Sequence, residues 1–422
     1  MGRRRRAAIP WLAGALVLAM LAFAGVVIAR RLEAPLPPVH VGITVDRSAV
    51  LSPGAPPLIP VPGDGAFQLD SDLDGLLAAR NEHSVRPIGS VAKIMTALTV
   101  LEAHPLQGAE AGPILTMTQS DVGFYRQALA EQGSTVPVAV GERLSERDLL
   151  LALLLPSANN AADTLSVWVA GDRSPFVAML NDHARALGMT QTHFDDASGY
   201  SPMTVSTAAD LVILARAALQ NTQLAGLVAT RSASLPDGTL LRNLDALLDT
   251  QPGWLGVKTG WTPQAGGCLM FAAHRSFPNA PPVTVFGAVL GQPPLAVADP
   301  GHPELGGALA AARAAVDTAL YSYVVVDPAR VSPALHGDIT SPWGARASAA
   351  VRASASRPLP IRIGTPIALA VTLRQPASGP LAGEVLGSVS GRLRGTTVAT
   401  WSLIARQTLP APSLWWRLTH AQ

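Results

Sequence analysis

The sequence predicts a mixed α/β (α+β) domain, with a helical cluster and a largely antiparallel sheet, between an N-terminal transmembrane helix and a small all-β domain. Three patterns support this: a long uncharged run near the N-terminus, helical and extended segments over residues 65–330, and short β-rich segments afterwards. The 422 residues are 48% hydrophobic and 14% charged, which is enough apolar material for two or three folded domains. This composition excludes a disordered or fibrous protein.

The first element is a predicted membrane-spanning helix. The run from Ala7 to Ala29 has no charged residue and would be about 34 Å long as a helix, enough to cross a bilayer. Arginines at 3–6 predict a cytoplasmic N-terminus and an extracytoplasmic bulk. A cleaved signal peptide is the alternative, because Ala22-Phe23-Ala24 resembles a cleavage site. We favour an uncleaved signal-anchor at residues 1–31; a cleaved one would leave a secreted or periplasmic protein.

The charge distribution argues against a nucleic-acid partner. Six arginines flank the apolar run, and the rest of the chain holds 25 basic and 29 acidic residues, a net charge of −4. The single cysteine, Cys268, excludes an intramolecular disulfide and a thiolate metal cluster. The nine histidines include no His-x-x-x-His pair, so we expect no metal and no cofactor.

The remaining elements follow in chain order. Residues 32–64 contain eight prolines and are expected to form an extended linker. The largest domain is placed at 65–330, with a hairpin (66–69 and 76–79), helices (90–103, 145–155, 160–170, 176–187, 207–219 and 308–321) and strands (255–259, 268–273 and 283–290). A β domain is expected at 334–410, with strands at 359–363, 367–373, 384–393 and 396–405. The tail, 411–422, carries Trp415 and Trp416, and either packs on that domain or contacts the membrane interface.

Only two of the 31 basic residues are lysines, and the first lies in a Ser-x-x-Lys pattern. Ser90 and Lys93 are three residues apart at the start of a predicted buried helix, so their side chains share one face. A neutral lysine amine can accept the serine proton, whereas arginine cannot lose its own. Desolvation and a second nearby cation would both favour that neutral amine. The pattern predicts a serine nucleophile.

The second lysine follows an apolar strand segment in Lys258-Thr259-Gly260. Lys258 and Thr259 can hold a carboxylate, and Gly260 would let a ligand lie against the strand backbone. Between the two lysines, Ser157 and Asn159 form a Ser-x-Asn pattern that can present a hydroxyl and an amide to the same cleft. Each motif alone is weak, but both lysines having these neighbours in this order is improbable by chance.

These three motifs resemble those of the penicillin-binding and serine β-lactamase superfamily, and most closely the low-molecular-weight D-alanyl-D-alanine carboxypeptidases. The similarity extends over about 65–330, including the text around the first motif at 86–97, Gly133-Ser134-Thr135, and 256–262. It continues faintly into 380–391, which looks like that family's C-terminal β domain. The resemblance implies a β-lactamase-like transpeptidase fold, peptidoglycan stem peptides as substrates and β-lactam antibiotics as inhibitors.

The resemblance also implies a role for each motif residue. Ser90 would be acylated with Lys93 as its base, while Ser157 and Asn159 would relay the proton and orient the substrate. The terminal carboxylate would bind Lys258 and Thr259, beside Gly260, and the backbone N–H groups of Ser90 and Trp261 would form the oxyanion hole. This sequence departs from the family pattern at three positions: Ala92, where threonine is usual, Ala158, where glycine is common, and Asn160, where aspartate is common.

The expected function is a membrane-anchored serine carboxypeptidase that removes terminal D-alanine from stem pentapeptides. A class A β-lactamase is the nearest rival, but residues 160–257 contain no glutamate to serve in deacylation. An endopeptidase of the same fold is harder to distinguish from a carboxypeptidase by sequence. A catalytically silent wall-binding protein is opposed by the intact serine and both lysines.

Overall fold

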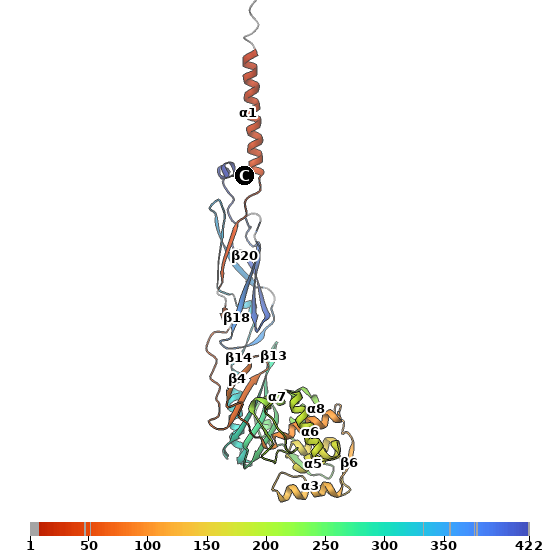
Figure 1. Ribbon diagram of the computed structural model, residues 1–422. Helices are drawn as coiled ribbons and strands as arrows, with labels where there is room; N and C mark the ends of the chain where they lie inside the picture. Colours follow the sequence, from red (N-terminus) through yellow and green to blue (C-terminus); the bar gives the residue numbers. More distant parts are fainter. Residues whose placement is uncertain are drawn as a thin grey trace, which may run out of the picture. The chain divides into compact units, whose positions relative to one another are not determined.

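The computed structural model describes residues 8–45, 48–50, 52–331, 333–353, 356–374, 376 and 379–420, and these form two compact units. The larger unit is Pro56–Val324, and the smaller one combines Met1–Ala55 with Val325–Gln422. Figure 1 shows a helix-rich part with a sheet in the larger unit and mostly strands in the smaller one.

A five-stranded antiparallel sheet is the centre of the larger unit. Its order is β11-β12-β13-β3-β4, from Trp254–Thr262, Gly266–Phe277, Ala280–Gln292, Ala66–Ser71 and Gly75–Arg80. The hairpin and the three later strands therefore lie where the sequence predicted strands, although the strands are longer. β11 is an edge strand, which leaves its outer edge open to the neighbouring segment that carries Ser90.

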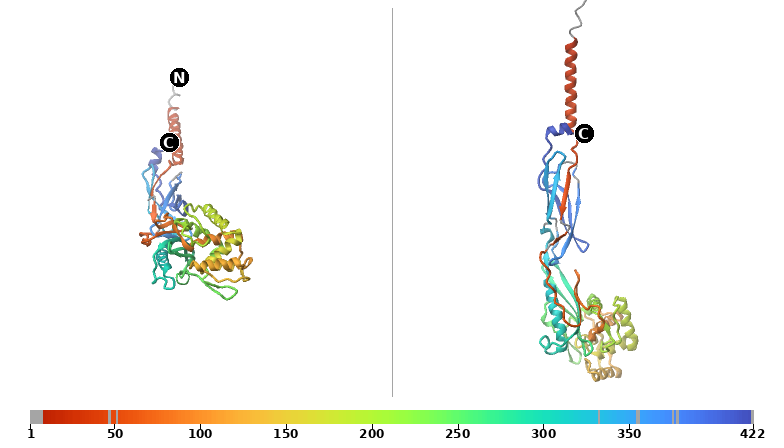
Figure 2. Two further views of the ribbon diagram at one scale, coloured as in Figure 1. Left: turned by 60° about the horizontal axis from the view of Figure 1, so that its bottom comes forward. Right: turned by 60° about the vertical axis from the view of Figure 1, so that its left-hand side comes forward.

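Alternating side chains on β12 give the sheet two buried faces. Met270 and Ala272 join one apolar core, while Phe271 and Ala273 join another, as a period of two requires. The first core is shared with the helical cluster and the second with α10 (Pro303–Tyr321). Figure 2 (right) shows the teal α10 and the yellow-green helices on opposite sides of the sheet.

The helical cluster holds the segments between β4 and β11. Its helices are η1 (Gly89–Ala92), α2 (Lys93–Ala103), α3 (Gln119–Ala130), α4 (Glu146–Leu154), α5 (Asn159–Ala170), α6 (Arg173–Ala186), α7 (Ala208–Gln220), α8 (Thr222–Val228) and α9 (Leu247–Thr250). Short strand pairs link β5 (Arg86–Pro87) with β8 (Val205–Ser206), β6 (Ile114–Thr116) with β7 (Arg143–Ser145), and β9 (Ser232–Ser234) with β10 (Leu240–Arg242). α3 was not predicted, although Thr118 and Asp121 form a capping box at its start.

The smaller unit contains a seven-stranded sheet in the order β1-β15-β16-β20-β19-β18-β2. These strands are His40–Val45, Leu335–Thr340, Arg346–Ala353, Thr396–Ala405, Val385–Leu393, Pro366–Leu373 and Ser48–Val50. The chain also forms β14 (Tyr323–Val326), η2 (Pro328–Arg330) and β17 (Leu359–Arg362). Trp401 is buried in the core of this sheet.

The structure corrects the prediction that residues 32–64 form only an extended linker. Within it β1 pairs with β15 and β2 pairs with β18, so this part of the chain completes both ends of the sheet. The physical reason is local: residues 39–52 contain no proline, and proline is the residue that would interrupt strand pairing.

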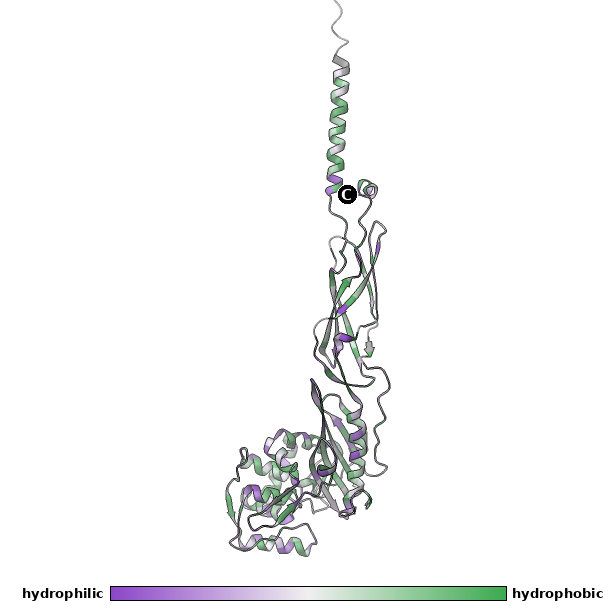
Figure 3. Cartoon of the chain, turned by 180° about the vertical axis from the view of Figure 1, so that it is seen from behind, coloured by the Kyte–Doolittle hydropathy of each residue, from purple (hydrophilic) through white to green (hydrophobic). Residues whose placement is uncertain are grey.

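The two chain ends of the smaller unit meet. Helix α1 (Ala8–Glu33) contains a stretch, Trp11–Glu33, that is long and apolar enough to cross a membrane, with a mean hydropathy of 2.6. Figure 3 shows it in green over most of its length. The tail forms α11 (Leu414–His420): Arg31 donates to the Leu418 carbonyl oxygen, and Arg417 donates to that of Leu32. The tail thus packs against the end of α1, and Trp416 packs edge-on against Trp343.

Candidate active site

The predicted nucleophile and base are in contact. Ser90 lies in the 3₁₀ turn η1, and Lys93 is the first residue of α2, so one turn separates them. The distance from Lys93 Nζ to Ser90 Oγ is 2.8 Å. Ser90 is half-buried, whereas Lys93 is completely buried. The serine hydroxyl can therefore be reached by a ligand, while the amine is hidden behind it.

Three groups surround the Lys93 amine, each at 2.8 Å: Ser90 Oγ, Asn159 Oδ1 and the carbonyl oxygen of Ser198. A neutral amine has two N–H donors and one lone pair. Asn159 Oδ1 and the Ser198 carbonyl are acceptors and can take the two donors, which leaves the lone pair for the Ser90 hydroxyl. Burial lowers the pKa of Lys93 well below its usual 10.5, and the nearby Lys258 cation adds to the effect.

Ser157 lies in the turn between α4 and α5, in a strained conformation. Its φ is +69°, in the left-handed region that non-glycine residues rarely adopt. The side chain is buried, and its Oγ has no hydrogen-bond partner among the described residues. A buried hydroxyl without a partner costs about 1–3 kcal/mol. Strain and an unsatisfied hydroxyl together are typical of a group held ready for a ligand.

Lys258 and Thr259 lie on the edge strand β11, and both are buried. The Nζ of Lys258 has one acceptor among the described residues, the Thr259 carbonyl oxygen at 3.0 Å, so two N–H donors remain for a ligand. Burial lowers the pKa of Lys258 to about 7, while the Asp245 carboxylate acts in the opposite direction. The geometry suits a ligand that brings its own negative charge.

Gly260 lies against the turn that carries Ser90. A Cβ there would lie 2.9 Å from the Val91 nitrogen and 3.0 Å from the Ser90 nitrogen, so the missing side chain lets η1 approach the strand. The next residue, Trp261, is 42% exposed. Its backbone nitrogen would be 3.1 Å from a Cβ on Gly89, which places it beside the serine turn.

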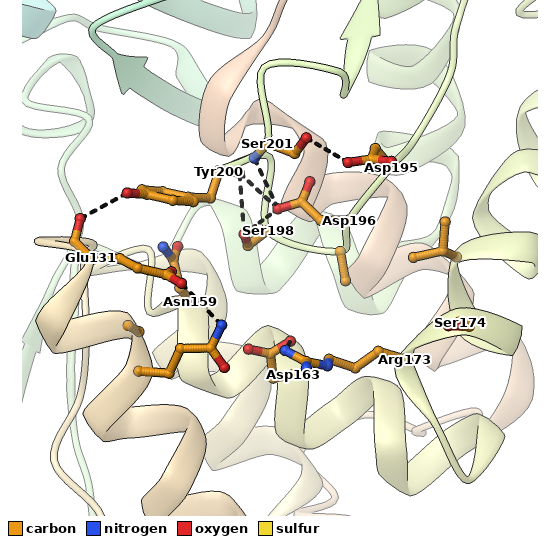
Figure 4. A pocket seen from close by; sticks show the side chains of 14 residues that line it. Glu131, Asn159, Asp163, Arg173, Ser174, Asp195, Asp196, Ser198, Tyr200 and Ser201 are labelled. Carbon is orange, nitrogen blue, oxygen red and sulfur yellow. Dashed lines mark hydrogen bonds and ion pairs between the residues drawn. The ribbon is translucent and has the colours of Figure 1, made fainter.

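A cleft of about 270 Å³ opens beside Ser90. It is lined by Ser90, Glu131, Gln132, Gly133, Ser134, Asn159, Tyr200, Trp261, Thr262 and Pro263. A second cavity of about 380 Å³ shares Glu131, Asn159 and Tyr200 with it and is shown in Figure 4. The Tyr200 hydroxyl donates to the Glu131 carbonyl oxygen at 2.9 Å, across the boundary between the two spaces. Residues far apart in the sequence thus converge around the serine.

Sequence reasoning missed Ser198 and Asp196, which lie beside the predicted motifs. Ser198 contributes a backbone carbonyl, a group that every residue has, so no sequence signal marks it.

Asn160 was noted only as a departure from the family pattern. Its Oδ1 accepts from the Val136 N–H at 3.1 Å and its Nδ2 donates to the Val136 carbonyl at 2.9 Å. The amide therefore attaches the segment between α3 and β7 to the start of α5.

Comparison with known proteins identifies the family. The sequence profile of peptidase family S11, described as D-alanyl-D-alanine carboxypeptidase, matches residues 60–288. The chain belongs to this family. It is 34% identical over 227 residues to a D-alanyl-D-alanine endopeptidase of Pseudomonas aeruginosa, covering 52% of this chain and 69% of that protein. It is also 34% identical to the D-alanyl-D-alanine carboxypeptidase DacB2 of Mycobacterium tuberculosis, covering 51% and 73%.

Solved structures agree with the sequence relatives. The DD-transpeptidase of Streptomyces K15 matches with a TM-score of 0.52 and 26% identity, over 64% of this chain and all of the other. A D-alanyl-D-alanine carboxypeptidase from Mycobacterium tuberculosis matches with a TM-score of 0.53 and 29% identity, over 64% and 96%. The predicted superfamily and fold class are confirmed. This S11 protein is a serine-type hydrolase of the DD-peptidase class.

The Asn160 amide gives a test of the loop attachment. Asn160→Asp keeps one acceptor but replaces the donor to the Val136 carbonyl with a second oxygen, so two acceptors would face each other. We expect a loss of about 1–3 kcal/mol in the free energy of unfolding, measured by denaturant titration. Asn279→Asp, at an exposed turn, is the matched control and should change stability by less than about 0.5 kcal/mol. Equal stability of the two variants would contradict the attachment.

Proposed function

We propose that this S11 protein is a D-alanyl-D-alanine carboxypeptidase that removes the terminal D-alanine from peptidoglycan stem pentapeptides through an acyl-enzyme on Ser90. The observation that carries the proposal is the buried Lys93 amine, placed 2.8 Å from the serine hydroxyl with acceptors for both of its N–H groups. It favours a working enzyme over a silent wall-binding protein, because burying an amine that does no chemistry costs stability without any return.

Substrate recognition would begin at the peptide's terminal carboxylate. Lys258 offers two N–H donors on the edge strand β11, and Thr259 is the next residue along that strand. A charge-assisted hydrogen bond in a dry site is stronger than one between neutral groups. The incoming carboxylate also favours the ammonium form of Lys258. The peptide would then lie along the edge strand with its last amide bond near Ser90.

Acylation would start with a proton transfer. The Ser90 hydroxyl donates its proton to the Lys93 lone pair, and Oγ attacks the carbonyl carbon of the last amide bond. The negative charge that develops on the carbonyl oxygen would be held by the backbone N–H groups of Ser90 and Trp261, as an oxyanion hole. In other hydrolases, one such donor is worth about 3–4 kcal/mol in the transition state.

Collapse of the tetrahedral intermediate would require a proton on the leaving amine. The lone hydroxyl of Ser157 is suited to pass the Lys93 proton to the amine nitrogen of the departing D-alanine, while Asn159 keeps the amine of Lys93 in place. The C–N bond breaks, and the peptide remains as an ester on Ser90. Water would then attack the ester with the same groups accepting its proton, and Ser90 is regenerated. β-Lactam antibiotics, which are strained cyclic amides, would acylate the same oxygen.

An endopeptidase that cleaves cross-links is the second candidate, and a specific observation favours it. The Pseudomonas aeruginosa relative, and another in Escherichia coli at 31% identity over 69% of its length, are D-alanyl-D-alanine endopeptidases. In both reactions, the amide bond that is cleaved follows a D-alanine carbonyl, and a carboxylate lies next to that bond. Lys258 could therefore bind the carboxylate of either substrate. The carboxypeptidase is the first candidate because the family is described by that activity.

For location, we propose a single-pass membrane protein with its catalytic unit outside the cytoplasm. The support is the apolar helix α1, with arginines before and after it. Its side chains from Trp11 onward are almost all exposed to the surroundings, as expected for a helix that contacts lipid rather than a protein core.

Labelling with fluorescent penicillin tests the nucleophile and the reaction. The wild type should be labelled covalently and Ser90→Ala should not, as seen on a denaturing gel. The labelled enzyme should also release D-alanine from a pentapeptide analogue, measured by an enzymatic D-alanine assay. No label on the wild type would remove the penicillin-binding assignment. Label without D-alanine release, but with cleavage of a cross-linked dimer, would establish the endopeptidase instead.

Exchange of each lysine for arginine separates the roles of the two lysines. Lys93→Arg should lower the acylation rate by about 100- to 10,000-fold, because a guanidinium cannot accept the serine proton. Lys258→Arg should be less severe and should act mainly on KM, since only a cation is needed there. The measurement is the rate of penicillin labelling and of D-alanine release for each variant. Normal acylation by Lys93→Arg would exclude Lys93 as the base.

The membrane anchor has its own test. Protein extracted from membranes with detergent should retain residues before α1, because an uncleaved anchor keeps the N-terminus. Intact-mass spectrometry of the extracted protein measures this directly. A mature N-terminus that follows Ala24 would instead establish a cleaved signal peptide.

A further inference from the structure

The segment 195–204, here called the 195–204 loop, is organised around one carboxylate. The side chain of Asp196 accepts five hydrogen bonds from its own loop. The donors are Ser198 Oγ (2.7 Å), the Gly199 N–H (3.0 Å), the Tyr200 N–H (2.9 Å), the Ser201 N–H (3.3 Å) and Thr204 Oγ1 (2.6 Å). Figure 4 shows Asp196 facing Ser198 and Tyr200 beside the cavity. A carboxylate with this many donors fixes the path of the backbone around it.

This path brings the loop against the catalytic turn. The carbonyl oxygen of Ser198 accepts from Lys93 Nζ at 2.8 Å, and that of Ala197 accepts from Thr96 Oγ1 at 2.6 Å. Gly199 has a φ of +75°, and a Cβ there would lie 1.9 Å from the Gly89 carbonyl oxygen. The loop is therefore packed directly on the turn that carries Ser90, and a small shift of its backbone would move the acceptor of the amine.

We infer that Asp196 is a positioning residue for catalysis: its carboxylate holds the Ser198 carbonyl where it takes one N–H of Lys93 and so directs the amine lone pair at Ser90. This inference rests on the proposed role of Lys93 as base. Asp196 belongs to a segment outside the three motifs. In this role it contacts neither the substrate nor Ser90.

The geometry explains why the carbonyl matters. A neutral lysine amine can rotate about its Cε–Nζ bond, and its lone pair has no fixed direction in isolation. Two acceptors, Asn159 Oδ1 and the Ser198 carbonyl, fix both N–H groups and therefore the lone pair. When one acceptor moves, the amine can turn away from Ser90, and a misplacement of about 1 Å can cost about 100-fold in rate.

Asp196 also acts on Lys93 through its charge, with a defined sign. Desolvation and the Lys258 cation lower the pKa of Lys93, while the Asp196 and Asp163 carboxylates raise it. Asp163 is itself paired with Arg173 at 3.5 Å, and burial raises its pKa to about 6; Glu131 and Asp195 line the same cavity. Removing the Asp196 charge therefore lowers the pKa of Lys93, so the neutral amine persists to lower pH.

The test compares Asp196→Asn with Asp195→Asn in the full-length protein. Asp195 is the adjacent carboxylate; it is exposed and accepts from Ser201 Oγ. It is a matched control because it lies in the same loop but is not one of the charges that shift the pKa of Lys93. The readout is the rate of labelling by fluorescent penicillin from about pH 5 to about pH 9. For Asp196→Asn we expect the plateau to fall by about 10- to 100-fold and the acidic limb to shift to lower pH. Asp195→Asn should match the wild type.

A third variant separates geometry from charge. Asp196→Glu keeps the charge but moves the carboxylate by one methylene group, so the plateau should fall while the acidic limb stays at the wild-type pH. If the plateau rate of Asp196→Asn falls but its acidic limb stays at the wild-type pH, Asp196 has only a structural role, and the inference is overturned. So would profiles of Asp196→Asn and Asp195→Asn that coincide.

Two controls keep these outcomes separate from other failures. Wild-type protein that takes no label would contradict the proposed function, whereas a labelled wild type with an unaffected Asp196→Asn contradicts this inference alone. If circular dichroism shows that Asp196→Asn is unfolded, Ser198→Ala replaces it, because that change removes one donor to the carboxylate and keeps the Ser198 carbonyl. Its plateau should fall by about fivefold, the equivalent of one hydrogen bond, with no shift of the limb; an unchanged plateau would overturn the inference.

Discussion

The contact between a buried amine and a serine hydroxyl sets the requirements for the rest of the larger unit. An ammonium at Lys93 would be stable only in water or beside a carboxylate at contact distance, and the structure instead gives it complete burial and neutral acceptors. Those acceptors are 66 and 105 residues away from Lys93 in the sequence. The helical cluster and the 195–204 loop must therefore be in place before the amine acquires its reactivity.

Close approach of backbones makes this convergence possible. Gly89, Gly199 and Gly260 each face another main-chain segment of the site at a distance where a Cβ would be crowded or would collide. At Gly199 the collision would be with the Gly89 carbonyl, and at Gly260 with the backbone of the Ser90 turn. Each glycine removes side-chain bulk where the loop, the turn and the edge strand meet, and this lets polar backbone groups surround the serine.

The sequence predicted the parts of this arrangement that depend on local spacing. Ser90 and Lys93 are one turn apart in any helical turn, so their contact followed from the spacing alone. Asn159 was expected in the same cleft by resemblance, and its contact with Lys93 is a tertiary result. The acceptor at Ser198 could not be predicted, because a backbone carbonyl carries no residue identity. Asp196 was also hidden, since an aspartate in a loop that contains serine, glycine and proline is ordinary turn chemistry.

The same distinction applies to the fold. The three long strands of the sheet alternate or run apolar for many residues, and such patterns are readable without tertiary information. β1 and β2 are short, and their partners, β15 and β18, are about 290 to 320 residues away in sequence. These two strands were not predicted because the proline content was judged over all of 32–64, and residues 39–52 within it contain no proline. Strand partners at such separation are decided by the completed sheet and not by the residues next to them.

The two lysines of an arginine-rich chain can now be compared by their surroundings. Both are buried, and in both cases burial is the largest cause of a lowered pKa. They differ in what each one faces. Lys93 faces neutral acceptors at 2.8 Å, which suit an amine that gives up its charge. Lys258 lies within the field of the buried Asp245 carboxylate and has two donors to spare, which suits an amine that regains its charge when an anionic ligand arrives. Arginine is charged in every environment and could not meet the first requirement. In the proposed mechanism, one residue type thus serves two opposite protonation states, and the difference lies in the acceptors that the fold places around each amine.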